Sequence, residues 1–239
     1  MKYGQNYYDF DEGGLFFISP NQLIASDDDN KEYAGYSLLV HPDFIRNYPL
    51  GKGIDKFGFF SYSANEALHL SEKEKQTIIS IFENIEQELT GTIDDFSQEV
   101  MISHIEVLLN YSNRFYKRQF ITRKAVSNDL LEKMQTILAN YFDNETSMMM
   151  SLPTVQYLAE QLNLSASYLS DMLRSLTGQN AQQHIHNKLI EKAKEILSTS
   201  NLSVAEVAYR LGFEHPQSFN KIFKRKTNLS PLEFRQSFN

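Results

Sequence analysis

The C-terminal part of the chain, residues 152–238, contains one helix–turn–helix pattern twice. In the first copy, apolar residues at helical spacing precede a short polar turn and a second apolar stripe. The second copy repeats this order 49 residues later as far as the turn and 50 residues later beyond it, so its turn is one residue longer. The apolar positions are Val155, Leu158, Ala159, Leu162, Leu164, Leu169 and Leu173 in the first copy and Val204, Val207, Ala208, Leu211, Phe213, Phe219 and Phe223 in the second. Two helices joined by a tight turn predict a helix-turn-helix, whose second helix can enter the major groove of DNA.

The second copy and the residues after it resemble the arabinose-regulator (AraC) family of bacterial transcription factors. The resemblance is carried by AYRLGF at 208–213, SFNKIFK at 218–224 and SPLEFR at 230–235, and it covers about the last ninety residues. Proteins of this family carry two helix-turn-helix units joined by one long helix, which places two recognition helices in successive major grooves. The resemblance implies units at about 154–176 and 203–226 and a joining helix over 180–198. We expect the buried side of the joining helix to contain Ile185, Leu189, Ala193, Ile196 and Leu197.

Three residues depart from the family pattern. Lys188 stands on the joining helix where the family often has arginine, which replaces a bidentate contact by a point charge. Leu173 replaces a common phenylalanine, a change in core volume. Asn228 replaces a common glycine, and asparagine is the next most tolerant residue at a left-handed helix end. We therefore keep the assignment.

The resemblance also implies which side chains touch DNA. On the second recognition helix, Gln217 can pair with adenine, Lys221 with guanine, and the ring of Pro216 can meet a thymine methyl group. On the first recognition helix, three alternatives stay open for the Asp171 carboxylate. It accepts a hydrogen bond from a cytosine amino group, it turns towards a neighbouring basic side chain such as Arg174, or it is merely solvated. The candidate base-reading residues are Ser167, Ser170, Asp171, Pro216, Gln217, Ser218 and Lys221. The candidate phosphate contacts, which position the protein without specifying a sequence, are Arg174, Lys188, Lys224 and Arg225.

Charge is divided unevenly along the chain. The net charge of −7 argues against a nucleic-acid-binding protein when taken alone. However, residues 151–239 hold ten Lys and Arg against seven Asp and Glu, whereas residues 1–150 hold thirteen against twenty-three. The excess of basic residues therefore coincides with the repeated motif. A further basic cluster at residues 114–124 is interpreted as a solvated helix end or, as the alternative, a contact to the DNA backbone.

Residues 1–64 are predicted to form a β-rich domain. Strand-sized segments at 7–10, 15–18 and 35–40 are separated by the turn-forming residues 11–14, 19–21 and 27–30. These residues resemble part of the cupin-like effector barrel that precedes the DNA-binding domain in the AraC family. The resemblance starts part-way into that barrel, so we expect either an abbreviated barrel or a truncated chain. The predicted fold class is α+β: a partial antiparallel β-barrel, a helical region and an all-α double helix-turn-helix domain.

Residues 65–145 are predicted to form a helical linker and dimerisation region. Ser71 and Glu74 form a capping box before a helix with Ile78, Phe82, Ile85 and Leu89 on one side, and Gly91 ends it. The next helix, over 96–118, is apolar on more than one face, so it is either fully buried in a monomer or shared with a second copy. The family resemblance favours the dimer, with Val100, Met101, Ile105 and Leu108 as candidate contacts. A third helix over 128–142 precedes a linker at 143–151 and the DNA-binding domain at 151–239.

The sequence offers no parts for catalysis or for cofactor binding. It lacks cysteine, a Walker loop and a glycine-rich dinucleotide turn, and His184 and His186 point in opposite directions on a helix. The chain also lacks a signal-peptide pattern at its start and any run of eighteen apolar residues, so we expect a soluble cytoplasmic protein without cofactor or metal. The prediction is a sequence-specific transcriptional regulator that binds double-stranded DNA, forms a homodimer, responds to a small-molecule effector, and contacts RNA polymerase if it is an activator. The alternative is a DNA-binding scaffold or truncated regulator without a functional effector pocket.

Overall fold

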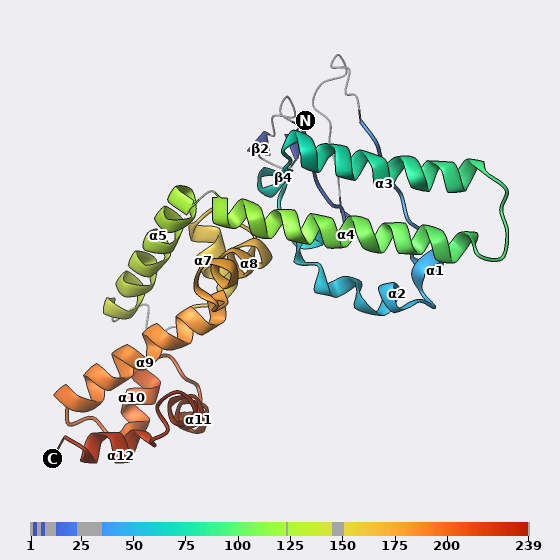
Figure 1. The fold of residues 1–239 in the computed structure, drawn as a ribbon. Coiled ribbons are helices and arrows are strands. Elements are labelled where there is room, and N and C mark those ends of the chain that lie inside the picture. The colour runs from blue at the N-terminus through green and yellow to red at the C-terminus, as the bar shows by residue number, and fades with distance from the viewer. Residues whose placement is uncertain are drawn as a thin grey trace. The chain divides into compact units, whose positions relative to one another are not determined.

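The computed structural model describes residues 2–3, 6–7, 13–22, 35–122, 124–144 and 151–238 (Figure 1). The chain forms two compact units, Met1–Arg123 and Lys124–Asn239. The first unit contains short strands and a pair of long helices, whereas the described residues of the second unit form helices and connecting turns without a strand.

The described strands of the first unit are short. Strand β1 (Lys2–Tyr3) pairs antiparallel with β2 (Asn6–Tyr7), and β3 (Gly14–Leu15) pairs antiparallel with β4 (Leu68–His69). These are the two sheets found among the described residues, so the expected partial β-barrel is not confirmed. The strand predicted at 15–18 ends at Leu15, and residues 8–12 and 27–30 lie outside the described part of the chain.

Much of the region predicted to be β-rich is helical or irregular instead. Residues 35–40 have no regular structure, so the strand predicted there is wrong. Pro42 and Pro49 begin helices α1 (Pro42–Ile45) and α2 (Pro49–Gly53), because proline favours the first helical position and cannot donate to a strand ladder. Three 3-10 turns follow at Ile54–Lys56, Gly58–Ser61 and Ala64–Glu66.

Helices α3 (Glu72–Thr90) and α4 (Ser97–Thr122) pack against each other in the first unit (Figure 1). The predicted capping box is confirmed, since the side chain of Ser71 accepts from the Glu74 N–H and Gly91 ends α3. Arg118 on α4 joins the two helices through its ion pair with Glu74, at 2.6 Å. The buried stripe of α3 runs through Ile78, Ile81 and Ile85, which leaves Leu89 exposed and corrects its predicted burial.

The second unit contains two helix-turn-helix pairs and one long helix between them. The first pair is α7 (Val155–Gln161) and α8 (Ala166–Thr177), and the second is α10 (Val204–Arg210) and α11 (Pro216–Thr227). Helix α9 (Ala181–Thr199) joins the pairs and contacts α7, α8, α10, α11 and the terminal helix α12 (Pro231–Gln236). The five residues predicted on the buried side of the joining helix are all buried, which confirms that prediction.

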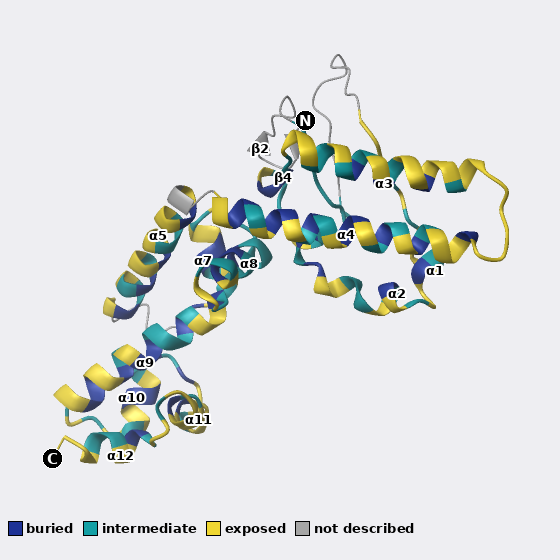
Figure 2. Cartoon of the chain, viewed as in Figure 1, coloured by how far each residue is buried: buried dark blue, intermediate teal, exposed yellow. Residues whose placement is uncertain are grey.

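Helix α5 (Lys124–Asp143) also belongs to the second unit, where it packs on α7, α8 and α9. Its buried side contains Met134, Leu138 and Phe142, and exposed residues occupy the opposite side (Figure 2). The Tyr141 hydroxyl donates to the carbonyl of Ser151 at 2.8 Å. The helical region predicted over 65–145 is thus divided between the two units. Most of the predicted linker, residues 145–150, lies outside the described residues.

Candidate nucleic-acid interface

The two helix-turn-helix pairs share their backbone geometry at equivalent positions. In the turn between the helices, Asn163 has φ +55° in the first pair and Gly212 has φ +84° in the second. Each second helix ends in a left-handed residue, Gly178 with φ +74° and Asn228 with φ +62°. Asparagine and glycine are the residues that tolerate this conformation best. The left-handed helix end expected at Asn228 is therefore confirmed. The sequence repeat is therefore also a structural repeat.

Side chains cap the starts of α7, α8 and α10, but not that of α11. Thr154, Ser165 and Ser203 each accept a hydrogen bond from the backbone N–H three residues later. Hydrogen bonds from the side chain and backbone of Ser203 also lower the pKa of the exposed Glu206 carboxyl. Helix α11 differs, because its N-cap residue His215 makes no side-chain cap and Pro216 occupies the first position. Uncapped N–H groups at a helix start are ready ligands for phosphate.

The second recognition helix, α11, presents a polar and basic face opposite its apolar face. Phe219 and Phe223 are fully buried against the rest of the unit. The predicted base-reading residues Gln217, Ser218 and Lys221 are exposed, and Pro216 is half-buried. The last turn contains Lys224, Arg225 and Lys226. Within the part of the chain that the structure describes, Lys221, Lys224 and Arg225 form no salt bridge. These cations are therefore available to an anionic partner.

The first recognition helix, α8, has a different exposed chemistry. Its core side contains Leu169, Met172 and Leu173, whereas the predicted base-reading residues Ser167, Ser170 and Asp171 are half-buried. Arg174 donates from Nη1 to Oδ1 of Asp171 at 2.9 Å, with side chains 58% and 29% exposed respectively. Of the alternatives considered for Asp171, the structure has the carboxylate turned towards Arg174. A predicted phosphate contact is thus paired with a predicted base reader.

The remaining phosphate candidate, Lys188, is half-buried on α9, and its Nζ lies 3.5 Å from Oε2 of Glu191. Sequence reasoning missed a neighbouring polar group, formed by Gln179, Asn187 and Lys226. The Asn187 amide bonds to both of the other side chains, at 2.8 and 2.9 Å. Lys226 lies 39 residues from Asn187, so helical spacing gave no signal for this contact.

The four candidate dimer residues do not share one environment. Ile105 and Leu108 are buried inside the first unit, because these positions lie on the side of α4 that packs in its core. Met101 is half-buried, and Val100 is 38% exposed. Val107, which was not among the candidates, is 41% exposed. The surface of α4 open to another molecule therefore differs from the predicted one.

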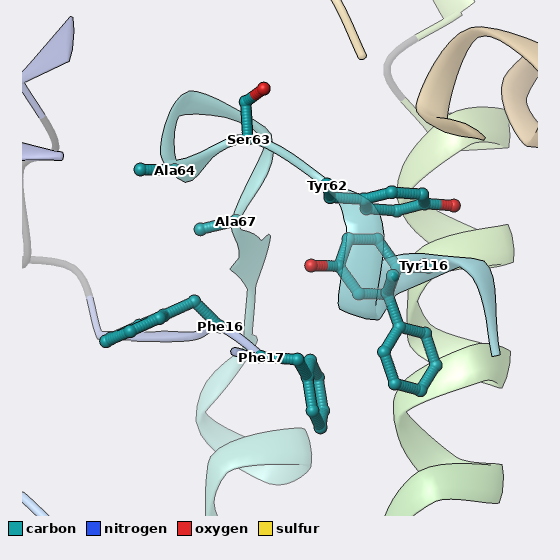
Figure 3. A pocket seen from close by; sticks show the side chains of 8 residues that line it. Phe16, Phe17, Tyr62, Ser63, Ala64, Ala67 and Tyr116 are labelled. Carbon is teal, nitrogen blue, oxygen red and sulfur yellow. The ribbon is translucent and has the colours of Figure 1, made fainter. Parts of the chain in front are cut away.

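The first unit has a small pocket lined largely by aromatic side chains (Figure 3). Phe16 and Phe17 directly follow β3. Tyr62, directly after the 3-10 turn Gly58–Ser61, meets Tyr116 of α4 edge to face, with ring centroids 5.1 Å apart. The cavity is about 10 Å³, room for one water-sized molecule. A sugar-sized effector would require these side chains to move.

Among the described residues, no helix has the length and apolar character needed to cross a membrane. The same residues include no group of three or more His, Cys, Asp or Glu that could hold a metal ion.

Two helix-turn-helix pairs around one joining helix, with a basic face on the second recognition helix, define a double helix-turn-helix DNA-binding unit. Comparison with known proteins agrees: residues 158–237 match the family model described as a helix-turn-helix domain. The second unit of this chain carries a DNA-binding domain of the AraC type, as the sequence resemblance predicted.

Curated relatives include the HTH-type transcriptional activator RhaS of Salmonella paratyphi B and of Salmonella newport. Each is 30% identical over 141 residues, which is 59% of this chain and 46% of the relative. The chain thus spans about half the length of the curated relatives it matches. These relatives are named as transcriptional activators.

Solved structures with similarity to this chain include the C-terminal domain of a response regulator and a DNA-binding domain. The C-terminal domain of the response regulator yesN from Fusobacterium nucleatum is 34% identical and matches 45% of this chain and 98% of its own, with a TM-score of 0.39. The DNA-binding domain of AdpA, solved with a target DNA, is 28% identical and matches 46% of this chain and 91% of its own, with a TM-score of 0.39.

Proposed function

We propose that this chain is a sequence-specific DNA-binding transcriptional regulator that places α8 and α11 in successive major grooves. The observation that supports this proposal most is the repeated geometry of the two pairs, together with the exposed Gln217, Lys221, Lys224 and Arg225 on α11. Long polar and cationic side chains on a recognition helix reach base edges and phosphates. Helix α11 therefore contributes most of the specificity, and α8 contributes mainly position.

The proposal is tested by selecting duplexes from a random library with the full chain and measuring the affinity for the selected site against salt concentration. Because neutralised phosphates release counterions, the affinity falls steeply as salt is added. Replacing Lys224 and Arg225 by glutamine lowers the log–log slope by about 0.9 for each lost phosphate contact. The matched control is Lys73→Gln, a change to an exposed lysine of the first unit. Failure to select any duplex, or an affinity that does not respond to salt, removes the proposal.

A second candidate is a DNA-binding protein that acts without a small-molecule effector, and the small size of the pocket in the first unit favours it. A ligand that binds only the folded state raises the apparent stability, and the increase grows with the logarithm of its concentration above the dissociation constant. The full chain is therefore heated with sugars, bile-type amphiphiles and fatty acids. An unchanged unfolding temperature supports this candidate. A rise in the unfolding temperature that increases with ligand concentration and that Tyr116→Ala abolishes supports effector control.

We infer that a homodimer, if formed through α4, uses Val100 and Val107 rather than Ile105 and Leu108. Val100 and Val107 are one heptad apart and exposed, so they lie on the same open side of the helix. Sedimentation of the full chain measures the mass. Val100→Glu with Val107→Glu shifts a dimer to the monomer, and the control Gln76→Glu, at an exposed position of α3, leaves the mass unchanged. A dimer that survives the double valine change uses another surface.

A further inference from the structure

Asn187 on α9 contacts the connection that follows α8 and the last turn of α11 through its side-chain amide. The residue lies half-buried in the second turn of α9. Its Nδ2 donates to Oε1 of Gln179 at 2.8 Å, and its Oδ1 accepts from Nζ of Lys226 at 2.9 Å. Both functions of the amide are therefore used, one on each side.

The two partners of Asn187 stand at the ends of the two recognition helices. Gln179 follows Gly178, the residue that ends α8. Lys226 lies in the last turn of α11. The amide on the joining helix thus forms a polar bridge, Gln179–Asn187–Lys226, between the ends of both helices that are proposed to enter DNA.

The chemistry of lysine fixes the orientation of this bridge. An ammonium group donates hydrogen bonds and accepts none, so Asn187 must turn its oxygen towards Lys226 and its nitrogen towards Gln179. The apolar contacts of α9, by contrast, are non-directional and leave freedom for small rotations of packed helices. The bridge supplies the directional restraint that the apolar core lacks.

Among the described residues, the bridge also gives Lys226 a side-chain hydrogen-bond partner that the other cations of the same turn lack. Lys226 is held by a side chain of the protein, whereas Lys224 and Arg225 form no salt bridge or side-chain hydrogen bond with the described residues. The end of α8 has a second link to α9, through Thr177 Oγ1 and His184 Nε2 at 2.9 Å. We therefore expect the bond between Lys226 and Asn187 to be the more sensitive half of the bridge.

We propose that Asn187 is a positioning residue that sets the angle and separation of α8 and α11, and through them the spacing of the two half-sites on DNA. This inference rests on the proposed function, in which both helices bind one duplex. A change of one base pair between half-sites moves the second groove by about 3.4 Å along the axis and about 35° around it. A protein that holds its two recognition helices in a fixed geometry loses affinity when the half-site spacing changes. A protein whose recognition helices can move relative to each other loses less affinity.

The experiment measures the affinity of the full chain for duplexes in which the two selected half-sites are moved apart or together by one base pair. Asn187→Leu keeps the size of the side chain but removes both hydrogen bonds. We expect about three- to tenfold weaker binding at the preferred spacing and a smaller penalty at the shifted spacings. Affinity for a duplex with the α11 half-site alone stays unchanged.

Conservative variants separate positioning from a general loss of structure. Asn187→Asp restores the spacing preference, because its carboxylate accepts from Lys226 and the Gln179 amide can rotate to donate. Gln182→Ala is the matched control, since the bond of this amide to His186, at 3.0 Å, stays within α9. Lys226→Met tests the same bridge from α11 and shows the same loss of spacing preference. Combining it with Asn187→Leu adds little further loss, because one bond is removed by both changes.

Three outcomes overturn the inference. The first is an unchanged spacing penalty in Asn187→Leu. The second is an equal loss in Lys226→Met at every spacing and at the single half-site, which identifies Lys226 as a phosphate contact. The third is an Asn187→Leu protein that does not fold, combined with a Lys226→Met protein that folds and keeps the parent's spacing preference. In each case the parent still binds its two-part site and the proposed function stands. A parent chain that binds no two-part site refutes the proposed function itself.

Discussion

Lys221 and Asp171 occupy equivalent positions on the two recognition helices and carry opposite charges. Lys221 is exposed, so its ammonium group can reach a guanine edge. Lys221→Ala is therefore expected to cost about 1–3 kcal/mol at the selected site and to relax the base preference beneath it. Lys224→Ala is the control and weakens all sequences alike. Selection followed by sequencing measures both, and an unchanged preference in Lys221→Ala contradicts this role.

Asp171→Ala acts in the opposite direction. Removing this carboxylate releases Arg174 from its 2.9 Å hydrogen bond and removes a charge that phosphates repel. Non-specific affinity therefore rises slightly, and the base preference stays the same. Asp171→Asn, which keeps the size of the side chain, gives a similar result. If the base preference moved in these variants, Asp171 would be a direct reader and the ranking of the two helices would be reversed.

His186 provides a pH test of the α9–α11 contact. Burial lowers the pKa of His186 from its ordinary value of 6.5, and the charges of Arg225 and Lys226 lower it further. At pH values between the pKa of His186 in the folded state and 6.5, the folded state therefore binds fewer protons than the unfolded state. The free energy of unfolding is highest above pH 6.5 and decreases as pH falls through the folded pKa. Unfolding titrations show a smaller decrease in His186→Gln, and an equal decrease contradicts the burial of His186.

At the scale of elements, α5 is part of the DNA-binding unit. Met134, Leu138 and Phe142 are buried against the helices that follow. We expect Leu138→Ala to lower the free energy of unfolding by about 2–5 kcal/mol. Removing the whole helix, by comparing residues 124–239 with 151–239, lowers stability further. The control Leu130→Ala changes a half-buried position of the same helix and costs less. Equal unfolding midpoints for the two segments would show that α5 is dispensable.

The helices of the second unit were predictable because their signals are local. The apolar spacing of α9, the capping residue Ser203 and the left-handed end at Asn228 depend on residues within one or two turns. The fold of the first unit was harder to predict, because Pro42 and Pro49 begin short helices in a region whose sequence pattern is typical of strands and turns. The exposure of Leu89 and the bridge from Asn187 to Lys226 depend on how helices pack, which spacing along one helix does not reveal. The recognition-helix residues came from a family resemblance, and their contacts with DNA stay predictions.

At the scale of the whole molecule, the charge is divided between an acidic first part and a basic C-terminal part. Residues 1–150 carry an excess of acids, while the last 89 residues carry an excess of bases. We expect the isolated segment 124–239 to bind non-specific DNA more tightly than the full chain, because removing the acidic part reduces long-range repulsion from phosphates. The difference narrows in high salt, where such repulsion is screened. Weaker binding by the segment at low salt would show that the first unit contributes DNA contacts of its own.

We propose that α8 and α11 enter successive major grooves of one duplex. Hydroxyl-radical footprinting of the full chain on its selected site measures this arrangement. The predicted result is two protected patches about 34 Å apart on one face of the duplex. Their sequences differ, because Ser167 and Asp171 on one helix correspond to Gln217 and Lys221 on the other. Protection confined to a single groove would contradict the claim.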